Sequence, residues 1–115
     1  MKRILYLVVL ISVIPVLLGV TGCGTSTKIS DITADPEKYE NTTVTVQGTV
    51  GTTQWFDIAE KGIYQLGDGT DTIWIITSEP PPQQGEKIKA TGKIQSAFSL
   101  LGKSYGTILM ETERK

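Results

Sequence analysis

The side chains available for chemistry in this 115-residue chain are carboxylates, hydroxyls, lysines and aromatic rings, because the sequence has no histidine and one cysteine. Ser-His-Asp and Cys-His catalysis both need an imidazole. Zinc sites of the usual type need several nitrogen or sulfur ligands, and covalent haem carriage through histidine is excluded for the same reason. Catalysis of these two types, the usual zinc sites and histidine-linked haem are therefore not expected.

Loop carboxylates are the remaining candidates for acid–base chemistry or cation binding. No spacing among Asp57, Glu60, Asp68 and Asp71 places two of them on either side of a substrate. We interpret them as solvated loop acids and predict no enzyme activity and no cofactor. Calcium could take oxygen ligands from the segment 68–71, but two carboxylates are too few for good affinity, so a plain turn is favoured over a metal site.

The single cysteine, Cys23, ends an apolar N-terminal segment. Two cations, the apolar stretch 4–20 and then small residues precede it, which are the parts of a secretory signal. The order Val20-Thr21-Gly22-Cys23 resembles the lipobox of bacterial lipoproteins. That resemblance implies cleavage before Cys23 and attachment of acyl chains, palmitate among them, to this residue. Several acyl chains would anchor the protein stably to a membrane.

An uncleaved membrane anchor is the alternative interpretation of residues 4–20, which are about as long as the shortest spanning helices. Both interpretations place the rest of the chain outside the cytoplasmic membrane, because Lys2 and Arg3 hold the N-terminus inside. The lipoprotein resemblance implies a location in the cell envelope, on the outer membrane or the periplasmic face in a Gram-negative cell. Gly24 after the cysteine implies sorting to the outer membrane there.

The lipoprotein interpretation divides the chain into a signal peptide (1–22), a small polar tether (23–28) and one small domain (29–115). The whole chain has a net charge of −1, and removal of Lys2 and Arg3 leaves −3. A protein that binds duplex nucleic acid usually has a basic surface, because phosphate neutralisation supplies much of the affinity. A nucleic-acid partner is therefore not favoured and would need a local basic patch.

The domain itself has the sequence pattern of a β-protein. Asp35 before Pro36 predicts a short N-terminal helix that ends before Asn41. Five strands would leave long free edges unless they closed, and Gly48 and Gly92 lie mid-strand, where a small barrel must coil tightly. We therefore predict an all-β, five-stranded, closed or nearly closed β-barrel. Its strands are indicated by period-two alternation and β-branched residues at 43–50, 62–66, 72–77, 86–95 and 105–112.

The core positions of these strands resemble those of the oligonucleotide/oligosaccharide-binding (OB) fold. The matching segments are Val44-x-Val46-x-Gly48-x-Val50, Tyr64-x-Leu66-x-Asp68-Gly69-Thr70, Ile73-x-Ile75 and Gly85-x-x-Ile88-x-Ala90-x-Gly92-x-Ile94. They are most similar in style to small OB domains of the tRNA-anticodon-binding type in bacterial envelope lipoproteins. The resemblance implies an OB-fold-like barrel and says nothing about the ligand. Three prolines between Glu79 and Gln84 depart from it, because many OB folds have a helix there.

A candidate binding face follows from the alternation of the second and third strands. If Tyr64 and Ile75 point into the barrel, their neighbours point outward and form an exposed apolar platform. OB folds bind ligands on that face, between the first and last inter-strand loops. Lysines on the outward side of the fourth strand add positive charge. The candidate ligand-binding residues are Trp55, Ile63, Gln65, Trp74, Ile76, Lys87, Lys89 and Lys93.

Several functions remain open for this face. Aromatic rings with lysines are typical of single-stranded nucleic-acid binding, and an OB barrel also suits oligosaccharides. Exposed apolar clusters mark protein partners, and the acidic, extracytoplasmic domain favours a protein or envelope component. A third function is that of a structural accessory of an envelope complex. The alternative for the residues is purely structural: Trp55 and Phe56 cap one barrel end, while the N-terminal helix covers Trp74 and Ile76.

Overall fold

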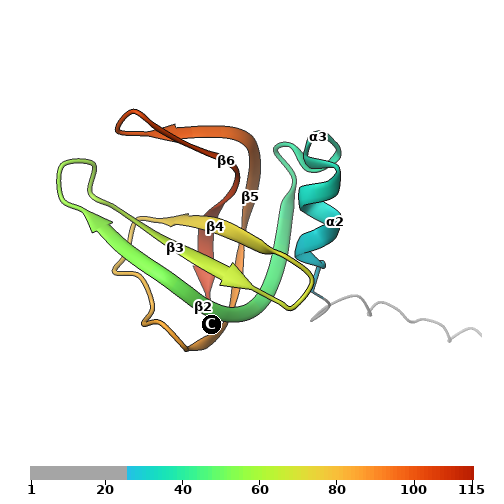
Figure 1. The fold of residues 1–115 in the computed structure, drawn as a ribbon, viewed down its shortest axis with the longest axis horizontal. Coiled ribbons are helices and arrows are strands. Elements are labelled where there is room, and N and C mark those ends of the chain that lie inside the picture. The colour runs from blue at the N-terminus through green and yellow to red at the C-terminus, as the bar shows by residue number, and fades with distance from the viewer. Residues whose placement is uncertain (1–25) are drawn as a thin grey trace, which may run out of the picture.

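The computed structural model describes residues 26–115, so the predicted signal peptide and Cys23 lie outside the described residues. The described chain forms two short helices followed by five strands (Figure 1). These are α2 (Ile29–Ala34), α3 (Pro36–Tyr39), β2 (Thr43–Phe56), β3 (Lys61–Gly67), β4 (Thr72–Thr77), β5 (Lys87–Leu100) and β6 (Lys103–Arg114). None of the helices between residues 26 and 115 has the length and apolar character that a membrane span requires.

The strands close into a barrel in the order β2-β3-β4-β6-β5. Four of the pairings are antiparallel, and β4 pairs with β6 in parallel at Trp74–Ile76. A five-stranded Greek-key barrel with this order is an OB fold. The predicted all-β barrel with a short N-terminal helix is confirmed, and the proline-rich segment between β4 and β5 contains no helix, as expected.

Two glycines permit the strands to cross at close range. A Cβ atom on Gly48 would lie 2.2 Å from the carbonyl oxygen of Gly67, and one on Gly92 would lie 2.0 Å from that of Met110. No side chain fits at such distances, so both positions require glycine. The prediction that these two residues mark tight bends of the barrel is confirmed.

The barrel interior is filled by apolar side chains from every strand. Tyr64, Leu66, Ile73 and Ile75 all point inward, as the alternation predicts. The remaining strand residues of this cluster are Val46, Val50, Ile88, Ala90, Ile94 and Leu109. Two residues of α2, Ile29 and Ile32, complete it and are fully buried. Helix α2 therefore closes one end of the barrel.

Helix α2 is held in place by the turn between β3 and β4. The backbone N–H of Ile29 donates to Asp68 Oδ2 at 2.9 Å, and that of Ser30 donates to Thr70 Oγ1 at 3.1 Å. The Thr33 hydroxyl donates to the Asp71 carboxylate. These bonds supply the N-terminal cap that Lys28, the residue before the helix, does not provide.

Hydrogen bonds at this turn also lower the pKa values of its two carboxyl groups. Partial burial acts to raise the pKa of Asp68, but hydrogen bonds from Ile29, Thr70 and Asp71 outweigh it and hold the pKa at about 2. The hydrogen bond from Thr33 lowers the pKa of Asp71. Both carboxylates thus serve protein donors, and residues 26–115 contain no group of three or more potential metal-ligating side chains. These contacts make the segment 68–71 a hydrogen-bonded turn that caps α2.

The opposite end of the barrel contains a buried polar network around Glu111. Its carboxylate accepts hydrogen bonds from the Tyr64 hydroxyl and from Thr77 Oγ1, the latter at 2.9 Å. Arg114 pairs with Glu111 at 3.4 Å and donates to the carbonyl oxygen of Pro80 at 2.8 Å. Burial raises the pKa of Tyr64 far above its usual value, the Glu111 carboxylate adds to this, and Arg114 opposes it.

Candidate functional site

The outer face of β3 and β4 is a second hydrophobic core. Ile63 and Ile76 point outward as predicted, but they are only 1% and 2% exposed. Together with Ile108 they form a buried cluster that is surrounded by the partly buried side chains of Phe56, Trp74, Phe98, Tyr105 and Met110. The expectation of an exposed apolar platform at Ile63 and Ile76 is therefore wrong.

The β5–β6 hairpin covers this face. Beyond the barrel, the hairpin bends across β4 and β3 (Figure 1), with register shifts near Phe98 and a positive φ of 72° at Gly106. Phe98 and Tyr105 pack on the outer cluster, and the ring of Tyr105 meets that of Trp74 edge-on at 5.6 Å between centroids. The alternative expectation, in which the N-terminal helix covers Trp74 and Ile76, is also wrong, because α2 packs into the end of the barrel.

The polar and aromatic edges of the predicted platform are only partly accessible. Gln65 is half-buried beside Gly51, and its Nε2 donates to Thr72 Oγ1 at 3.4 Å. Trp74 is also half-buried, with its ring held against Tyr105. A base or sugar could therefore reach the margin of this face but not the centre of the cluster.

Exposed apolar side chains gather instead at the tips of two hairpins. Trp55 is 41% exposed, Ile58 89% and Leu101 57%, and these are the exposed large hydrophobic residues of the described chain. Trp55 and Ile58 belong to the β2–β3 hairpin, while Leu101 lies in the β5–β6 turn. Both hairpins adjoin the outer cluster, through Phe56 and Phe98, and their tips project to the upper left in Figure 1. The ring of Trp55 lies on the other side of the β2–β3 hairpin, beside Thr77 and Pro81 and away from the outer cluster. We therefore call Ile58 and Leu101 the hairpin-tip surface.

The backbone at these tips is unusual. Leu101 has φ of 51° and Glu60 has φ of 52°, in the left-handed region that favours glycine. An L-residue in this conformation costs about 1 kcal/mol. The β5–β6 turn thus presents an exposed leucine at a position where a glycine would be easier to accommodate. Positive φ at both Leu101 and Gly102 is what a tight two-residue hairpin turn requires.

The tips also occupy the place where OB folds hold their ligands. They are the loops between the first and second strands and between the fourth and fifth strands of the barrel. Sequence reasoning placed Trp55 beside the site but did not identify Ile58 or Leu101. The signal was present, since both are large apolar residues inside short predicted turns, where polar residues are usual.

The predicted lysines lie elsewhere on the barrel. Lys87, Lys89 and Lys93 face outward on β5, opposite residues 43–49 of β2. Lys87 and Lys93 are exposed and Lys89 is half-buried. Because this β2–β5 side is separate from the outer face of β3 and β4, the structure does not combine the lysines with the aromatic residues into one site.

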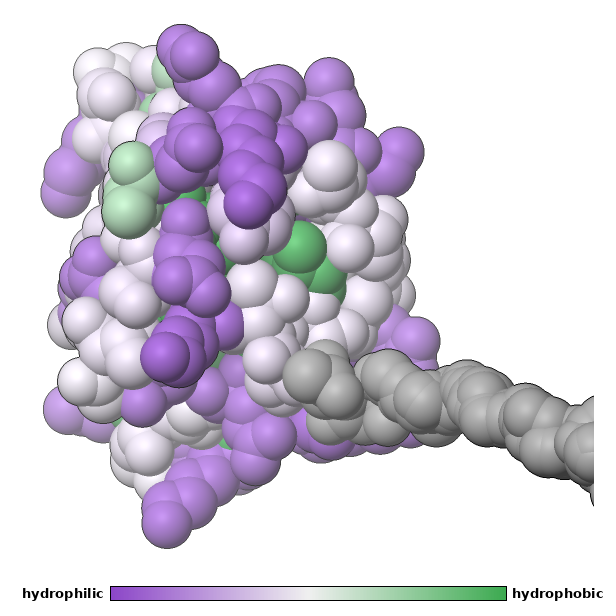
Figure 2. Space-filling view, turned by 90° about the vertical axis from the view of Figure 1, so that its right-hand side faces the viewer, coloured by the Kyte–Doolittle hydropathy of each residue, from purple (hydrophilic) through white to green (hydrophobic). Residues whose placement is uncertain are grey.

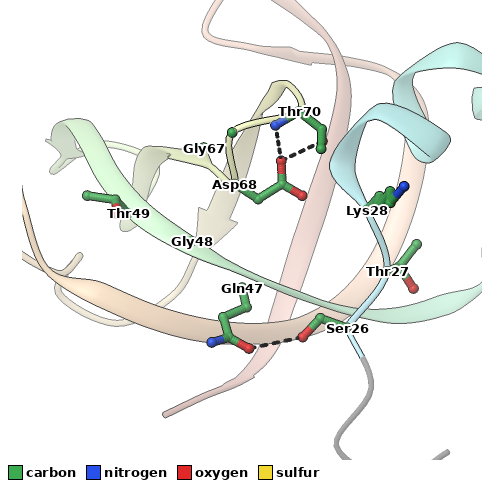
Figure 3. A pocket seen from close by; sticks show the side chains of 10 residues that line it. Ser26, Thr27, Lys28, Gln47, Gly48, Thr49, Gly67, Asp68 and Thr70 are labelled. Carbon is green, nitrogen blue, oxygen red and sulfur yellow. Dashed lines mark hydrogen bonds between the residues drawn. The ribbon is translucent and has the colours of Figure 1, made fainter.

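A shallow polar pocket of about 480 Å³ lies where the described chain begins (Figure 3). It is lined by 26–28, by 47–49 of β2 and by 67–70 of the β3–β4 turn. Ser26 Oγ donates to Gln47 Oε1 at 3.3 Å, and the Asp68 carboxylate already accepts the bonds described above. The side chains of Ser26, Gln47 and Asp68 thus stabilise the fold around this pocket.

Comparisons with known proteins agree on the fold alone. No protein-family model matches the sequence, and no curated protein sequence is significantly similar to it. Asparaginyl-tRNA synthetase from Pyrococcus horikoshii, complexed with asparaginyl-adenylate, is similar in structure over 79% of this chain, with a TM-score of 0.64 and 11% identity. A Leishmania major Friedlin protein assigned as an aspartyl-tRNA synthetase matches over 88%, with a TM-score of 0.62 and 14% identity.

In both cases the chain spans 22% of the length of the larger protein. The OBody AM1L10, in a structure where it is bound to hen egg-white lysozyme, is similar over 72% of this chain and 87% of its own, with a TM-score of 0.52 and 16% identity. At these identities the likeness establishes the architecture, and the chain is accordingly an OB-fold-like barrel.

Proposed function

We propose that this protein is a lipid-anchored, non-catalytic OB-fold module outside the cytoplasmic membrane, and that it binds a partner protein through the hairpin-tip surface. The observation that carries the proposal is the exposure of Ile58 and Leu101 at the two loops where OB folds hold ligands. The neighbouring sheet face is filled by the chain's own β5–β6 hairpin, so the tips are the accessible apolar part of this region.

A protein is the partner that best fits this surface. Exposed apolar clusters are costly in water and commonly mark protein–protein contacts. The net charge of −3 expected after signal cleavage would repel a polyanion at long range. The OBody shows that a barrel of similar architecture can hold a protein, in its case lysozyme.

Single-stranded nucleic-acid binding is the second candidate. The likeness to two synthetases that act with tRNA favours it, as do the lysines of β5. Base stacking, however, needs accessible aromatic faces. Burial of Ile63 and Ile76, together with the edge contact of Trp74 to Tyr105, leaves little of the platform for a base.

The tip proposal is tested by site-specific photocrosslinking in the native membrane. A photoreactive residue at Ile58 or Leu101 should give a discrete protein adduct, and the same residue at Thr43, on the other side of the barrel, should not. Ile58→Asp should abolish the adduct formed from position 101 without unfolding the protein, because Ile58 packs against little. Absence of an adduct from either tip would refute the proposed surface.

Two further measurements address the anchor and the second candidate. Mass spectrometry of the membrane fraction should find Cys23 as a lipidated N-terminal residue, and Cys23→Ser should block processing; an unprocessed wild-type mass would contradict the lipoprotein interpretation. Titration of the domain with single-stranded DNA at low salt tests the nucleic-acid function. Salt-sensitive binding that Trp74→Ala removes would favour this function over the protein partner.

A further inference from the structure

The described chain enters the barrel on the side of β2 that lies far from the hairpin tips. The backbone N–H of Thr27 donates to the carbonyl oxygen of Thr45 at 2.8 Å, and Ser26 Oγ donates to the side chain of Gln47. In Figure 1 this entry point is at the lower right, below α2, while both tips are at the upper left. An anchor attached shortly before residue 26 would therefore lie on the side of the barrel opposite to the hairpin tips.

Five lysines surround this entry point. Gln47 pairs with Lys89 across the β2–β5 ladder, and it lines one shallow depression together with Lys87, Lys89 and Lys115. Lys28 lines the neighbouring pocket, which Gln47 and Ser26 share. Lys93 continues the row along β5. We call these residues the lysine face: Lys28, Lys87, Lys89, Lys93 and Lys115.

The lysine face reverses the charge of the rest of the domain. It contains five of the nine cations of residues 26–115, and three acidic residues lie beside it. The rest of the described chain contains the other four cations and nine acidic residues, so it is negative where the lysine face is positive. Among the described residues the recorded ion pair is Arg114 with Glu111, so none of the five lysines is paired. Figure 2, which shows the helix side of the molecule, has many hydrophilic residues and small, separate green areas rather than a broad apolar patch.

The tether would bring this face close to a membrane. Three residue steps separate Cys23 from Ser26, and an extended chain covers at most about 3.5 Å per residue, or roughly 10 Å in all. That distance is about one Debye length at physiological salt, within which charges on the domain interact with charged headgroups. This step rests on the proposed function, because it takes Cys23 to be the anchored residue.

We propose that the lysine face binds anionic phospholipid headgroups, so that the domain rests on its membrane with this face down and presents the hairpin-tip surface to the aqueous side. Charge complementarity selects the headgroup, and the short tether selects which face can reach it. The anchored barrel thereby has a fixed orientation. The same lysines are then unavailable for a soluble partner that binds at the tips.

The test uses the chain from Cys23 to Lys115, which retains every described core side chain, since the core runs from Ile29 to Leu109. The Cys23 thiol is coupled to a maleimide lipid in vesicles of phosphatidylcholine alone, or with about one-third phosphatidylglycerol. Accessible amines are acetylated for a short time, and the rate at each lysine is measured by mass spectrometry. Circular dichroism and a cooperative thermal transition verify the fold.

On anionic vesicles the lysine face should be acetylated at least about fivefold more slowly than on neutral ones, and the protection should vanish at about 0.5 M salt. Lys38, Lys61 and Lys103 should react equally on both. The variant K87Q/K89Q/K93Q should lose the protection of Lys28 and Lys115, while the matched control K38Q/K61Q/K103Q should keep it. Equal acetylation rates of the lysine face on anionic and neutral vesicles would overturn the proposal, whether those rates are fast on both or slow on both. Because the lipid is coupled chemically, this result does not depend on whether the cell acylates Cys23. That separate question is answered by the mass of the membrane-bound protein.

Discussion

Replacing Tyr64 with phenylalanine removes one hydroxyl from the buried network around Glu111 and leaves the ring in the core. The hydroxyl is fully buried and donates to the Glu111 carboxylate, which still accepts from Thr77 and still pairs with Arg114 in the variant. Loss of one hydrogen bond to a charged acceptor costs about 2 kcal/mol. We expect the free energy of unfolding at pH 7 to fall by that amount, with no change in the fold.

The same substitution has a second effect at alkaline pH. Burial, with Glu111, raises the pKa of Tyr64 above its unfolded value of 10.0. Stability that depends on the protonated phenol is fully present below pH 10, and it is lost above pH 10 because the unfolded chain releases a proton that the folded chain keeps. The slope for one such proton is about 1.4 kcal/mol per pH unit. Tyr64→Phe has no phenol proton at this position. Above pH 10 its free energy of unfolding should therefore fall less steeply than that of the wild type, by about 1.4 kcal/mol per pH unit.

Urea denaturation of both proteins from pH 7 to pH 11, followed by circular dichroism, measures both effects. The difference between the two stability curves should be constant below pH 10 and should shrink above it. This comparison cancels the titration of every other group that the two proteins share. Parallel curves through pH 11 would show that Tyr64 ionises as easily in the barrel as in the unfolded chain, and the account of the network would be wrong.

Three other substitutions address the parts of the fold that position the sites. Asp68→Ala should lower the free energy of unfolding, measured with urea, by about 1 kcal/mol, as loss of a helix cap does. This difference from the wild type should disappear as the pH falls from about 4 to about 2, because the pKa of Asp68 is lowered from its ordinary value to about 2 in the folded protein. Gly92→Ala should cost at least about 2 kcal/mol, because its Cβ would lie 2.0 Å from a carbonyl oxygen, whereas Gly51→Ala, with 3.5 Å to the nearest atom, should be tolerated in the same assay. Tyr105→Ala should increase the fluorescence of an apolar dye by uncovering Ile63 while the far-ultraviolet spectrum stays unchanged, and an unchanged fluorescence would show that the hairpin is not the cover.

Much of the barrel could be predicted, because the direction of each side chain and the positions of the glycines depend on short stretches of the sequence. Alternation assigns Tyr64 and Ile75 to the interior, since successive side chains of a strand point to opposite faces. Gly48 and Gly92 interrupt β-branched runs, and only a close approach of backbones explains a glycine there. These positions are determined within a few residues along the chain, so a single sequence contains enough to identify them.

The candidate site could not be predicted in the same way. Alternation predicts that the outward-facing Ile63 and Ile76 are exposed, because nothing near them in the sequence covers them. In the structure, Phe98 and Tyr105 of a distant hairpin pack over their cluster. The sequence pattern also predicts that the fourth strand ends at Gln95, whereas its pairing continues through a bulged segment to Leu100. Both errors concern contacts between distant segments, which alternation within one strand does not encode.

The cap of α2 makes the first element of the domain dependent on a later part of the chain. A helix of six residues is not stable alone in water, because nucleation is costly and few hydrogen bonds follow it. Its capping groups, Asp68 and Thr70, lie about forty residues downstream. The segment 29–34 therefore depends on the β3–β4 turn to hold its helical conformation. Because Ile29 and Ile32 also complete the core, a change in the β3–β4 turn should loosen the barrel end as well as the helix.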